Sequence, residues 1–384
     1  MSKRIVFIIT DYGSFNNFLG DVAVRLVRLG NKIDVISSAS KVIDIEDKYD
    51  YNEAGIVFHP VNLPRGFNPF KHYSASKMIH KIVNQIQPNV VSIHFTTGAF
   101  TTTFTGRLNY HTSATFHGLG YPVITDRVKR FVYKFVEDRC FKRVDEVWVL
   151  NRFDLELLES RRLNVPVRQV PTKGLGCDLE KFDPNKFSLD FKSSLRGSLT
   201  IEPSDFVIGF TGRYVTFKGF DKVVRAFKML CEERNISNIK LLLIGGRDDI
   251  HPSGLTDLEE QWLLHSKQVI NIGFSSKVQD YLSITDLFVF PSEKEGMPVC
   301  IIEALAMNVP VITADARGCN DLIVDGKNGI LLQLSTESEI ADGVLKLKDD
   351  TVFYNSLKEE IKTQRANYDR THFINQQVDF FESK

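Results

Sequence analysis

The stretch EGMPVCIIEA, residues 295–304, decides the fold more than any other part of the chain. It follows an apolar run that ends at Pro291 and begins a helical pattern that reaches Met307. This order places Gly296 and the amides after it at a helix N-terminus beyond the carboxyl end of a strand, where N–H groups and the helix dipole attract phosphate. Glu295 and Glu303 are too far apart to share one metal ion, but they can hold two ends of an elongated ligand such as a sugar attached to a nucleotide.

Short apolar runs alternate with helical patterns along the whole chain, which predicts parallel sheets built from βαβ units. The runs are nearly all-apolar, as expected for strands that helices cover on both faces. The sequence therefore predicts two Rossmann-like halves. Their strands are expected at 5–10, 32–37, 55–59, 90–94, 113–117, 146–150 and 168–171, and then at 206–211, 240–244, 269–272, 287–290, 309–314 and 329–333.

The length of 384 residues suits two domains, each with its own core. The periodicity is interrupted between Asp178 and Ser204 by a stretch rich in Ser and Lys. We therefore expect one domain to cover residues 1–185 and the next to begin at 186.

Two cations follow the first strand of the second half. Arg213 comes directly after Gly212, and Lys218 precedes Gly219. Glycines at a strand-to-helix turn let a phosphate approach the backbone, and two cations at this spacing can bracket a pyrophosphate. A solvated Arg and a Lys near a helix cap is the simpler alternative. The first and the fourth or fifth strands of a doubly wound sheet open onto the same crevice, which favours a shared site with Glu295.

The element Glu295-(seven residues)-Glu303, with FPS before it at 290–292 and ALA after it at 304–306, resembles that of the family 4 retaining glycosyltransferases. The resemblance implies an α/β GT-B fold, in which two Rossmann-like domains face each other across a cleft. It also implies a C-terminal helix that returns to the first domain, so that residues 366–384 complete the domain of 1–185 and residues 186–365 form the nucleotide-sugar-binding domain.

The family's site roles pass to the matching positions of this chain. The resemblance implies that Glu295 meets hydroxyls of the donor sugar, that Glu303 binds the ribose, and that Arg213 and Lys218 hold the diphosphate. Further donor contacts are expected from the residues beside these groups, namely Gly212, Gly296, Met297, Pro298 and Val299.

The first half offers a histidine and an aromatic loop. His117 ends a strand before the turn Gly118-Leu119-Gly120, and family members place a His or a related polar residue here, facing the donor. A histidine with a purely structural role is the alternative. The loop after the first strand has only Gly13 where many members have paired glycines, and its residues Phe15, Asn17 and Phe18 are expected either to meet the acceptor or to pack.

A helix predicted over 126–145 is amphipathic. Its apolar stripe, which runs from Val128 to Val144, is expected to pack on the sheet. Its basic face carries Lys129, Arg130 and Lys134 and is expected to meet anionic lipid headgroups. The absence of Asp and Glu between Glu53 and Asp126 supports an anionic partner, although a chance run with buried strands explains it equally well.

Composition and missing motifs exclude other classes. Hydrophobic residues make up 43% and charged residues 25%, as in soluble globular proteins. There is no Asp-x-Asp pair, no Cys/His cluster, no third glycine of a dinucleotide fingerprint and no phosphate-binding P-loop, so neither a metal nor another cofactor is expected. The five cysteines lack C-x-x-C spacing and suggest free thiols. With no 18-residue apolar run and too short an apolar segment after Lys3-Arg4 for a signal peptide, we expect a cytoplasmic protein.

Over nearly its whole length the chain resembles enzymes that extend undecaprenyl-diphosphate-linked glycans in O-antigen or capsule biosynthesis. The expected activity is a retaining, metal-independent transfer (EC 2.4 class) of an N-acetylhexosamine or a hexose from a UDP-sugar to a lipid-linked saccharide. The expected partners are the nucleotide-sugar, a polyprenyl-diphosphate-linked saccharide and the anionic inner face of the plasma membrane, with no nucleic acid. A nucleotide-sugar epimerase of the same fold and a catalytically silent nucleotide-sugar-binding subunit remain as alternatives.

Overall fold

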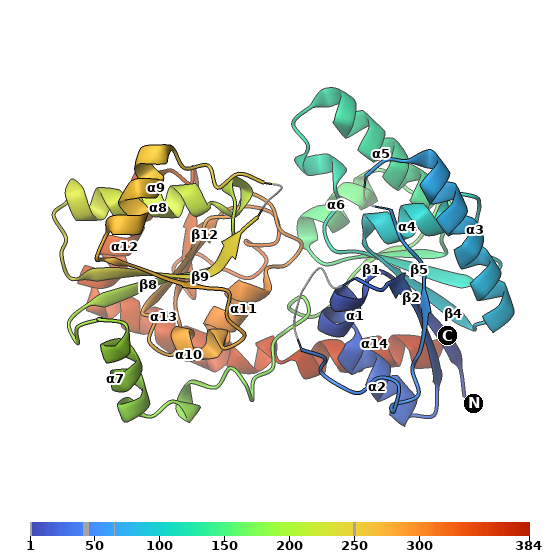
Figure 1. The fold of residues 1–384 in the computed structure, drawn as a ribbon, viewed down its shortest axis with the longest axis horizontal. Coiled ribbons are helices and arrows are strands. Elements are labelled where there is room, and N and C mark those ends of the chain that lie inside the picture. The colour runs from blue at the N-terminus through green and yellow to red at the C-terminus, as the bar shows by residue number, and fades with distance from the viewer. Residues whose placement is uncertain (1, 41–45, 65, 249–250) are drawn as a thin grey trace. The chain divides into compact units, whose positions relative to one another are not determined.

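The structure, a computed structural model, describes residues 2–40, 46–64, 66–248 and 251–384 (Figure 1). Its described residues form two compact units. The first contains the chain up to Leu175 together with Thr371–Lys384, and the second contains Gly176–Arg370. Each unit has its own parallel sheet and is described separately.

The first unit is built on a seven-stranded sheet of order β3-β2-β1-β4-β5-β6-β7, in which all paired strands are parallel. Consecutive strands run outward from β1 in one direction and from β4 in the other, so the order reverses between β1 and β4. The strands are β1 (Arg4–Asp11), β2 (Lys32–Ser38), β3 (Val57–Pro60), β4 (Val90–His94), β5 (His111–Phe116), β6 (Glu146–Val149) and β7 (Val167–Gln169).

Helices cover both faces of this sheet (Figure 1). Val6 and Ile8 of β1 belong to one core cluster, whereas the intervening Phe7 packs edge-on against Phe381 at 5.3 Å. Successive β1 side chains alternate between the two faces, and since both faces are buried the strand is apolar throughout. The helices of this unit are α1 (Tyr12–Phe18), α2 (Gly20–Arg28), α3 (Pro69–Ile86), α4 (Phe95–Thr103), α5 (Arg127–Phe141), α6 (Arg152–Ser160) and α14 (Arg370–Ser383), with a 3-10 turn η1 (Tyr121–Val123).

The second unit repeats this plan with a six-stranded sheet of order β10-β9-β8-β11-β12-β13. Its strands are β8 (Phe206–Tyr214), β9 (Ile239–Arg247), β10 (Val269–Gly273), β11 (Leu287–Phe290), β12 (Val311–Ala314) and β13 (Gly329–Leu332). Its helices and 3-10 turns are η2 (Pro184–Lys186), α7 (Leu189–Ser198), η3 (Thr216–Lys218), α8 (Phe220–Glu232), α9 (Asp257–His265), α10 (Val278–Leu282), α11 (Val299–Ala306), α12 (Glu337–Asp349), α13 (Thr351–Gln364) and η4 (Arg365–Tyr368).

The predicted α/β fold with two Rossmann-like sheets is confirmed, and so is the terminal helix that returns to the first unit. The end of α14 is fastened there by Asn31, which donates from Nδ2 to Glu382 Oε1 at 2.7 Å. Every predicted strand is present. The largest differences are at β8 and β9, which continue past 211 and 244 because Gly212 pairs with Gly245 and lets the two backbones run on together.

The prediction for the apolar stripe of α5 is wrong in its first half. Val128, Phe131 and Phe135 are 73, 72 and 59% exposed, and only the second half, from Val136 onward, is buried against the sheet. The helix begins at Arg127, where Asp126 caps it by accepting from Lys129 N at 2.7 Å. Two turns of α5 therefore carry an apolar surface that no described segment covers.

The predicted basic face of α5 also divides at the middle of the helix. Toward the C-terminal end, Arg139 and Arg143 donate to backbone carbonyls, Arg139 to Phe104 and Arg143 to both Thr103 and Phe104. These carbonyls lie at the C-terminal end of α4, where a helix favours cations. Lys129 and Arg130, in the first half of the helix, are exposed beside the uncovered apolar side chains.

Candidate active site

The second sheet places two loops at one point. Strands β8 and β11 are neighbours and parallel, with Leu287 opposite Ile208. The chain continues from β8 to β9 on one side and from β11 to β12 on the other. The gap between the carboxyl ends of β8 and β11 is therefore the topological switch point, where open α/β sheets bind ligands. The loop after β8 carries Arg213 and Lys218, and the loop after β11 carries Glu295. The predicted convergence of these two segments is therefore present.

Glycines let the loop after β8 lie close to its neighbours. A Cβ atom at Gly245 would stand 1.9 Å from the carbonyl oxygen of Gly212, so any side chain there would separate the two strands. Gly219, at φ +74°, begins α8, and a Cβ there would approach the carbonyl oxygen of Pro291 to 2.5 Å. The backbone beside Lys218 thus touches the end of β11, and this close approach requires glycine.

Lys218 and Glu295 form an ion pair at the switch point. The Lys218 ammonium donates to Oε1 of Glu295, and the Ser292 hydroxyl donates to the same oxygen at 2.8 Å. The two side chains are only 19 and 12% exposed. The ammonium also lies 5.4 Å from the centre of the Phe290 ring. The structure thus joins the group expected for the diphosphate to the group expected for the sugar, and an ammonium with three donors can keep this carboxylate while binding a phosphate oxygen.

Arg213 has a different partner. Its guanidinium donates to Oδ2 of Asp248 and lies 5.5 Å from the centre of the Phe217 ring. The side chain is 53% exposed. The structure therefore places Arg213 after the same strand as Lys218 but in a separate ion pair with Asp248, a counter-ion that sequence reasoning did not identify.

The N-terminus of α11 follows Glu295 directly. Pro298 is its N-cap and makes no side-chain cap hydrogen bond, and the first turn contains no acidic residue. An uncapped helix start is suited to an anion. Gly296 and Val299 are half-buried there, whereas Met297 and Pro298 are buried.

A second loop, which sequence reasoning left without a role, holds Glu295 from the other side. Arg317 donates from Nε to the Glu295 carbonyl at 3.1 Å, and Glu295 N donates to the Arg317 carbonyl at 3.2 Å. Gly318, at φ +80°, lies so close that a Cβ would stand 2.7 Å from the Gly296 carbonyl oxygen. The short sequence ARGC at 316–319 is the local signal that could have identified this support.

Glu303 lies on α11 and is half-buried. Burial raises the pKa of its carboxyl to about 7, and the positive charge of Lys181 opposes part of that effect. No hydrogen-bond partner for this carboxyl occurs among the described residues. It is therefore available to a ligand, and its charge changes near neutral pH.

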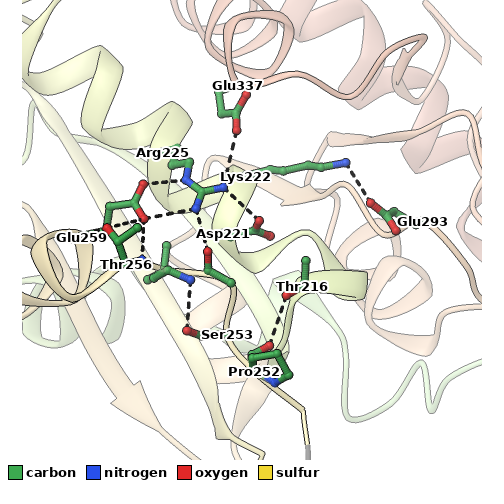
Figure 2. A network of polar contacts seen from close by, with 12 residues as sticks. Thr216, Asp221, Lys222, Arg225, Pro252, Ser253, Thr256, Glu259, Glu293 and Glu337 are labelled. Atoms are coloured by element: carbon green, nitrogen blue, oxygen red, sulfur yellow. Dashed lines mark hydrogen bonds and ion pairs between the residues drawn. The ribbon is translucent and has the colours of Figure 1, made fainter.

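Figure 2 shows a polar network that has Arg225 of α8 at its centre and includes Thr216 of η3. Arg225 donates to Glu259 at 2.6 Å and to the Gly254 carbonyl at 2.7 Å. The hydrogen bond from Arg225 lowers the pKa of Glu259 to about 2, so this acid is charged. Pro252, two residues before Gly254, also takes part: its carbonyl oxygen accepts a hydrogen bond from Thr216 N at 3.2 Å. The network thus connects α8 to η3, the turn that carries Lys218.

In the first unit, His117 follows β5 in a pocket of aromatic rings. It is half-buried, and its ring stacks on Phe95 at a centroid distance of 4.2 Å and contacts Phe18 at 5.3 Å. Nε2 lies 3.2 Å from Nδ1 of His94. Burial lowers the pKa of His117 to about 4, so the imidazole is neutral at physiological pH.

Two buried carboxylates hold the turn after His117. Asp154 accepts from Leu119 N at 3.0 Å, and Glu137 accepts from Gly120 N at 2.7 Å. Both acids are 0% exposed. Neither was singled out from the sequence, because their role depends on α5 and α6 lying beside the turn.

The aromatic loop of the first unit gives a mixed result. Phe15 is 0% exposed and packs against Tyr51 at 5.3 Å and Phe58 at 5.4 Å, so packing is the correct one of its two expected roles. Phe18 and Asn17 are half-buried, and Phe18 lies beside His117. In the parts of the chain that the structure describes, no group of three or more acidic, His or Cys side chains has metal-site geometry.

The fold and the switch-point loops place the chain in the GT-B class. The Anabaena protein Alr3699/HepE in complex with UDP has the same fold, with a TM-score of 0.77 at 15% identity over 99% of this chain and 100% of that one. The profile "Glycosyltransferase Family 4" matches residues 16–172, and "Glycosyl transferases group 1" matches residues 191–364. The chain belongs to the family 4 glycosyltransferases.

Two curated relatives are similar over part of their length. The capsular polysaccharide biosynthesis glycosyltransferase CapM of Staphylococcus aureus is 31% identical over 48% of this chain and 46% of its own. The UDP-Gal:alpha-D-GlcNAc-diphosphoundecaprenol alpha-1,3-galactosyltransferase of Escherichia coli is 26% identical over 62% of this chain and 60% of its own. The matches thus span roughly half of these relatives' lengths.

Proposed function

We propose that the chain transfers a hexosyl or N-acetylhexosaminyl group from a UDP-sugar to a polyprenyl-diphosphate-linked saccharide, without a metal and with retention of the anomeric configuration. The observation that carries this proposal is the Lys218–Glu295 contact at the β8–β11 switch point, beside the uncapped start of α11. A cation, a carboxylate and a helix N-terminus at one place suit a diphosphate joined to a sugar. The activity in the name of the Escherichia coli relative supports the choice of donor and acceptor class.

The chemistry assigned to this site is electrostatic. As the bond from the anomeric carbon to the diphosphate breaks, charge grows on the leaving oxygen, and Lys218, Arg213 and the amides around Val299 stabilise it. Loss of one such donor typically costs 2.7–4 kcal/mol. Glu295 orients the sugar, Glu303 accepts from the ribose hydroxyls, and neutral His117 contributes a hydrogen bond to the sugar. No side chain is assigned as a covalent nucleophile.

A panel of nucleotide-sugars tests this function. We expect a UDP-sugar to raise the melting temperature, because a ligand that binds only the folded chain stabilises it. With a lipid-linked saccharide added, the same donor should yield a glycosylated product of retained configuration. Undiminished turnover by Glu295→Ala would contradict the site assignment. Conversion of the donor in the absence of any acceptor, followed by NMR, would instead identify an epimerase.

The acceptor class implies work at a lipid surface, and we propose that the first half of α5 meets it. Val128, Phe131 and Phe135 are exposed there beside Lys129 and Arg130. Apolar side chains in the interface combined with cations near anionic headgroups give reversible surface binding, with about 1 kcal/mol from each cation. Lys134 adds less, because it is paired with Asp138 at 2.9 Å. Among the described residues no helix has the length and apolar character of a membrane span.

Sedimentation with vesicles tests this surface. The wild-type chain should pellet with anionic vesicles and stay in solution with zwitterionic ones. Charge reversal of Lys129 and Arg130 should weaken binding by about 2 kcal/mol or more, roughly thirtyfold. Phe131→Ser with Phe135→Ser should weaken it independently of salt, since it removes apolar insertion. Binding unchanged in both variants would refute this surface.

A further inference from the structure

The switch point of the first sheet lies between β1 and β4, and His94 is the last residue of β4. His94 is 2% exposed, and the half-buried His117 follows the neighbouring strand β5. The two strands pair in parallel with His94 opposite Thr115. Both imidazoles therefore lie at the carboxyl-terminal ends of the strands, where an open α/β unit binds ligands. His117 has an assigned role in the proposed function, whereas His94 has none.

A short chain of hydrogen bonds passes through both rings. The Ser92 hydroxyl lies 3.1 Å from Nε2 of His94, and Nδ1 of His94 lies 3.2 Å from Nε2 of His117. No further side-chain bond of Ser92 Oγ or of His117 Nδ1 exists among the described residues. Burial lowers the pKa of both histidines, so each ring is neutral and carries one N–H and one lone pair.

Only one direction of this chain gives the proton of the buried Ser92 hydroxyl an acceptor. If His117 donated to His94, then His94 would donate to Ser92, and the Ser92 hydroxyl proton would lack an acceptor at a site that is 2% exposed. A buried donor without a partner costs about 1–3 kcal/mol. In the opposite direction the Ser92 hydroxyl donates to His94, and His94 donates from Nδ1 to Nε2 of His117. The proton of His117 is then on Nδ1.

Phe95 fixes the plane of the ring. It begins α4 at φ +66°, in the left-handed region that is costly for a large side chain. This conformation accompanies the stacking of its ring on His117 at 4.2 Å and 27°. Stacking on Phe95 and the bond from His94 together determine both the orientation and the tautomer of His117.

We propose that His94 is a positioning residue, which donates from Nδ1 to His117 and so keeps His117 in the tautomer whose Nδ1–H is offered to the bound sugar donor. This inference rests on the proposed function for the identity of the ligand. It makes His117 a hydrogen-bond donor, suited to a sugar hydroxyl oxygen or a phosphate oxygen, and not an acceptor.

The tautomer can be measured directly in ligand-free protein. With histidine labelled in both ring nitrogens, ¹⁵N spectra should show His117 as the neutral Nδ1–H form; His117→Gln assigns the signal. His94→Asn retains an N–H near the Nδ1 position and should preserve this form. His94→Gln retains only a group near Nε2, toward Ser92, and should give a mixture of the two tautomers. An Nε2–H form in the wild type, or the wild-type pattern in His94→Gln, would overturn the proposal.

Kinetics supply the second readout. His94→Gln should lower kcat about tenfold with little change in the donor KM, and His94→Asn should stay within about threefold of the wild type. The control is His72, another buried histidine of this unit, which bonds to Thr101 at 3.0 Å and to the Gly66 carbonyl at 2.9 Å. His72→Gln should leave kcat and the His117 signal unchanged.

Equal losses in His94→Asn and His94→Gln would mean that His94 is only structural, and the proposal would fall. If no UDP-sugar reacts with the wild type, the proposed function fails, whereas the spectra still decide the tautomer. The two failures are therefore distinguishable.

Discussion

The two sheets share one topology but carry different chemistry at their switch points. In the second unit the loops after β8 and β11 present an ion pair of Lys218 with Glu295, and Arg213 is paired with Asp248 nearby. In the first unit the corresponding region, with β5 beside it, presents the neutral rings of His94 and His117. The comparison teaches that strand order decides where loops meet, whereas a few side chains decide what such a place can bind.

The difference has a simple electrostatic origin. In the second unit the largely buried Lys218 has the carboxylate of Glu295 in contact, which offsets part of the cost of desolvation. In the first unit no acid occurs between Glu53 and Asp126, the segment that supplies both histidines, and burial therefore holds them neutral. One site is suited to a dianionic diphosphate and the other to hydroxyl groups.

The largest expected effect comes from removing the charge at the second switch point. Lys218→Met keeps the apolar stem but removes the ammonium, and we expect kcat to fall 100- to 1000-fold because a donor to the leaving diphosphate is lost. Steady-state kinetics with the reactive UDP-sugar measures the change. Lys228→Met is the matched control, since Lys228 lies on α8 with Glu232 at 3.8 Å as its partner. If kcat falls less than fivefold in Lys218→Met, the second switch point does not act through its charge, and the contrast with the neutral switch point of the first unit fails.

The next effect is the pH dependence of folding stability that comes from Glu137, a buried acid of the first unit. Burial raises the pKa of Glu137 to about 7, and among the described residues its Oε2 has no hydrogen-bond partner. Below about pH 4.5 this group is protonated in both the folded and the unfolded chain. As the pH rises toward 7 it ionises only in the unfolded chain, so stability is lost, by on the order of 3 kcal/mol.

Glu137→Gln removes this titration. Relative to the variant, the wild type should become less stable between pH 4.5 and 7, with no further change above pH 8. Urea unfolding monitored in the first unit at pH 5 and pH 8 measures it. If the free energies of unfolding of the wild type and the variant change equally with pH, Glu137 is not held protonated in the folded chain.

The smallest effect sharpens the role of Glu303. Since burial raises its pKa to about 7, its ionised fraction rises about tenfold from pH 6 to pH 8. A carboxylate accepts from ribose hydroxyls better than a neutral carboxyl does, so UDP-sugar affinity should rise up to about tenfold over this range. Isothermal titration with the wild type and Glu303→Gln checks it, and a UDP-sugar has no phosphate that titrates there. If the affinity of Glu303→Gln rises equally from pH 6 to pH 8, Glu303 is not the titrating group.

The strands and the loops of the second switch point could be predicted from the sequence. The strands were found because both faces of each sheet are covered, so that their apolar runs stand out from the helical periods. Gly219 and the segment around Gly296 were also readable, since strand-to-helix turns that approach other backbone leave short local signatures. The motif from Glu295 to Glu303 is of this local kind.

The prediction for α5 shows where such reasoning fails. Its apolar stripe continues through Val128, Phe131 and Val136, but only Val136 and the residues after it reach the sheet. Periodicity records which side chains share a face and not whether another element covers that face. The partners of Arg213 and Glu137 were hidden for a related reason, since Asp248 and Gly120 reach them only through the fold.

By itself the sequence determined the two parallel sheets and the order of strands and helices along the chain. It also determined the positions of Lys218, Glu295 and His117 after strands and of Glu303 within a helix, because these follow from short-range patterns. The tertiary structure alone decided that Lys218 contacts Glu295, that His94 contacts His117, and that the first turns of α5 stay exposed. Hydrogen bonds, charge pairing and burial depend on which distant segments lie within a few ångströms of each other, and no local pattern contains that information.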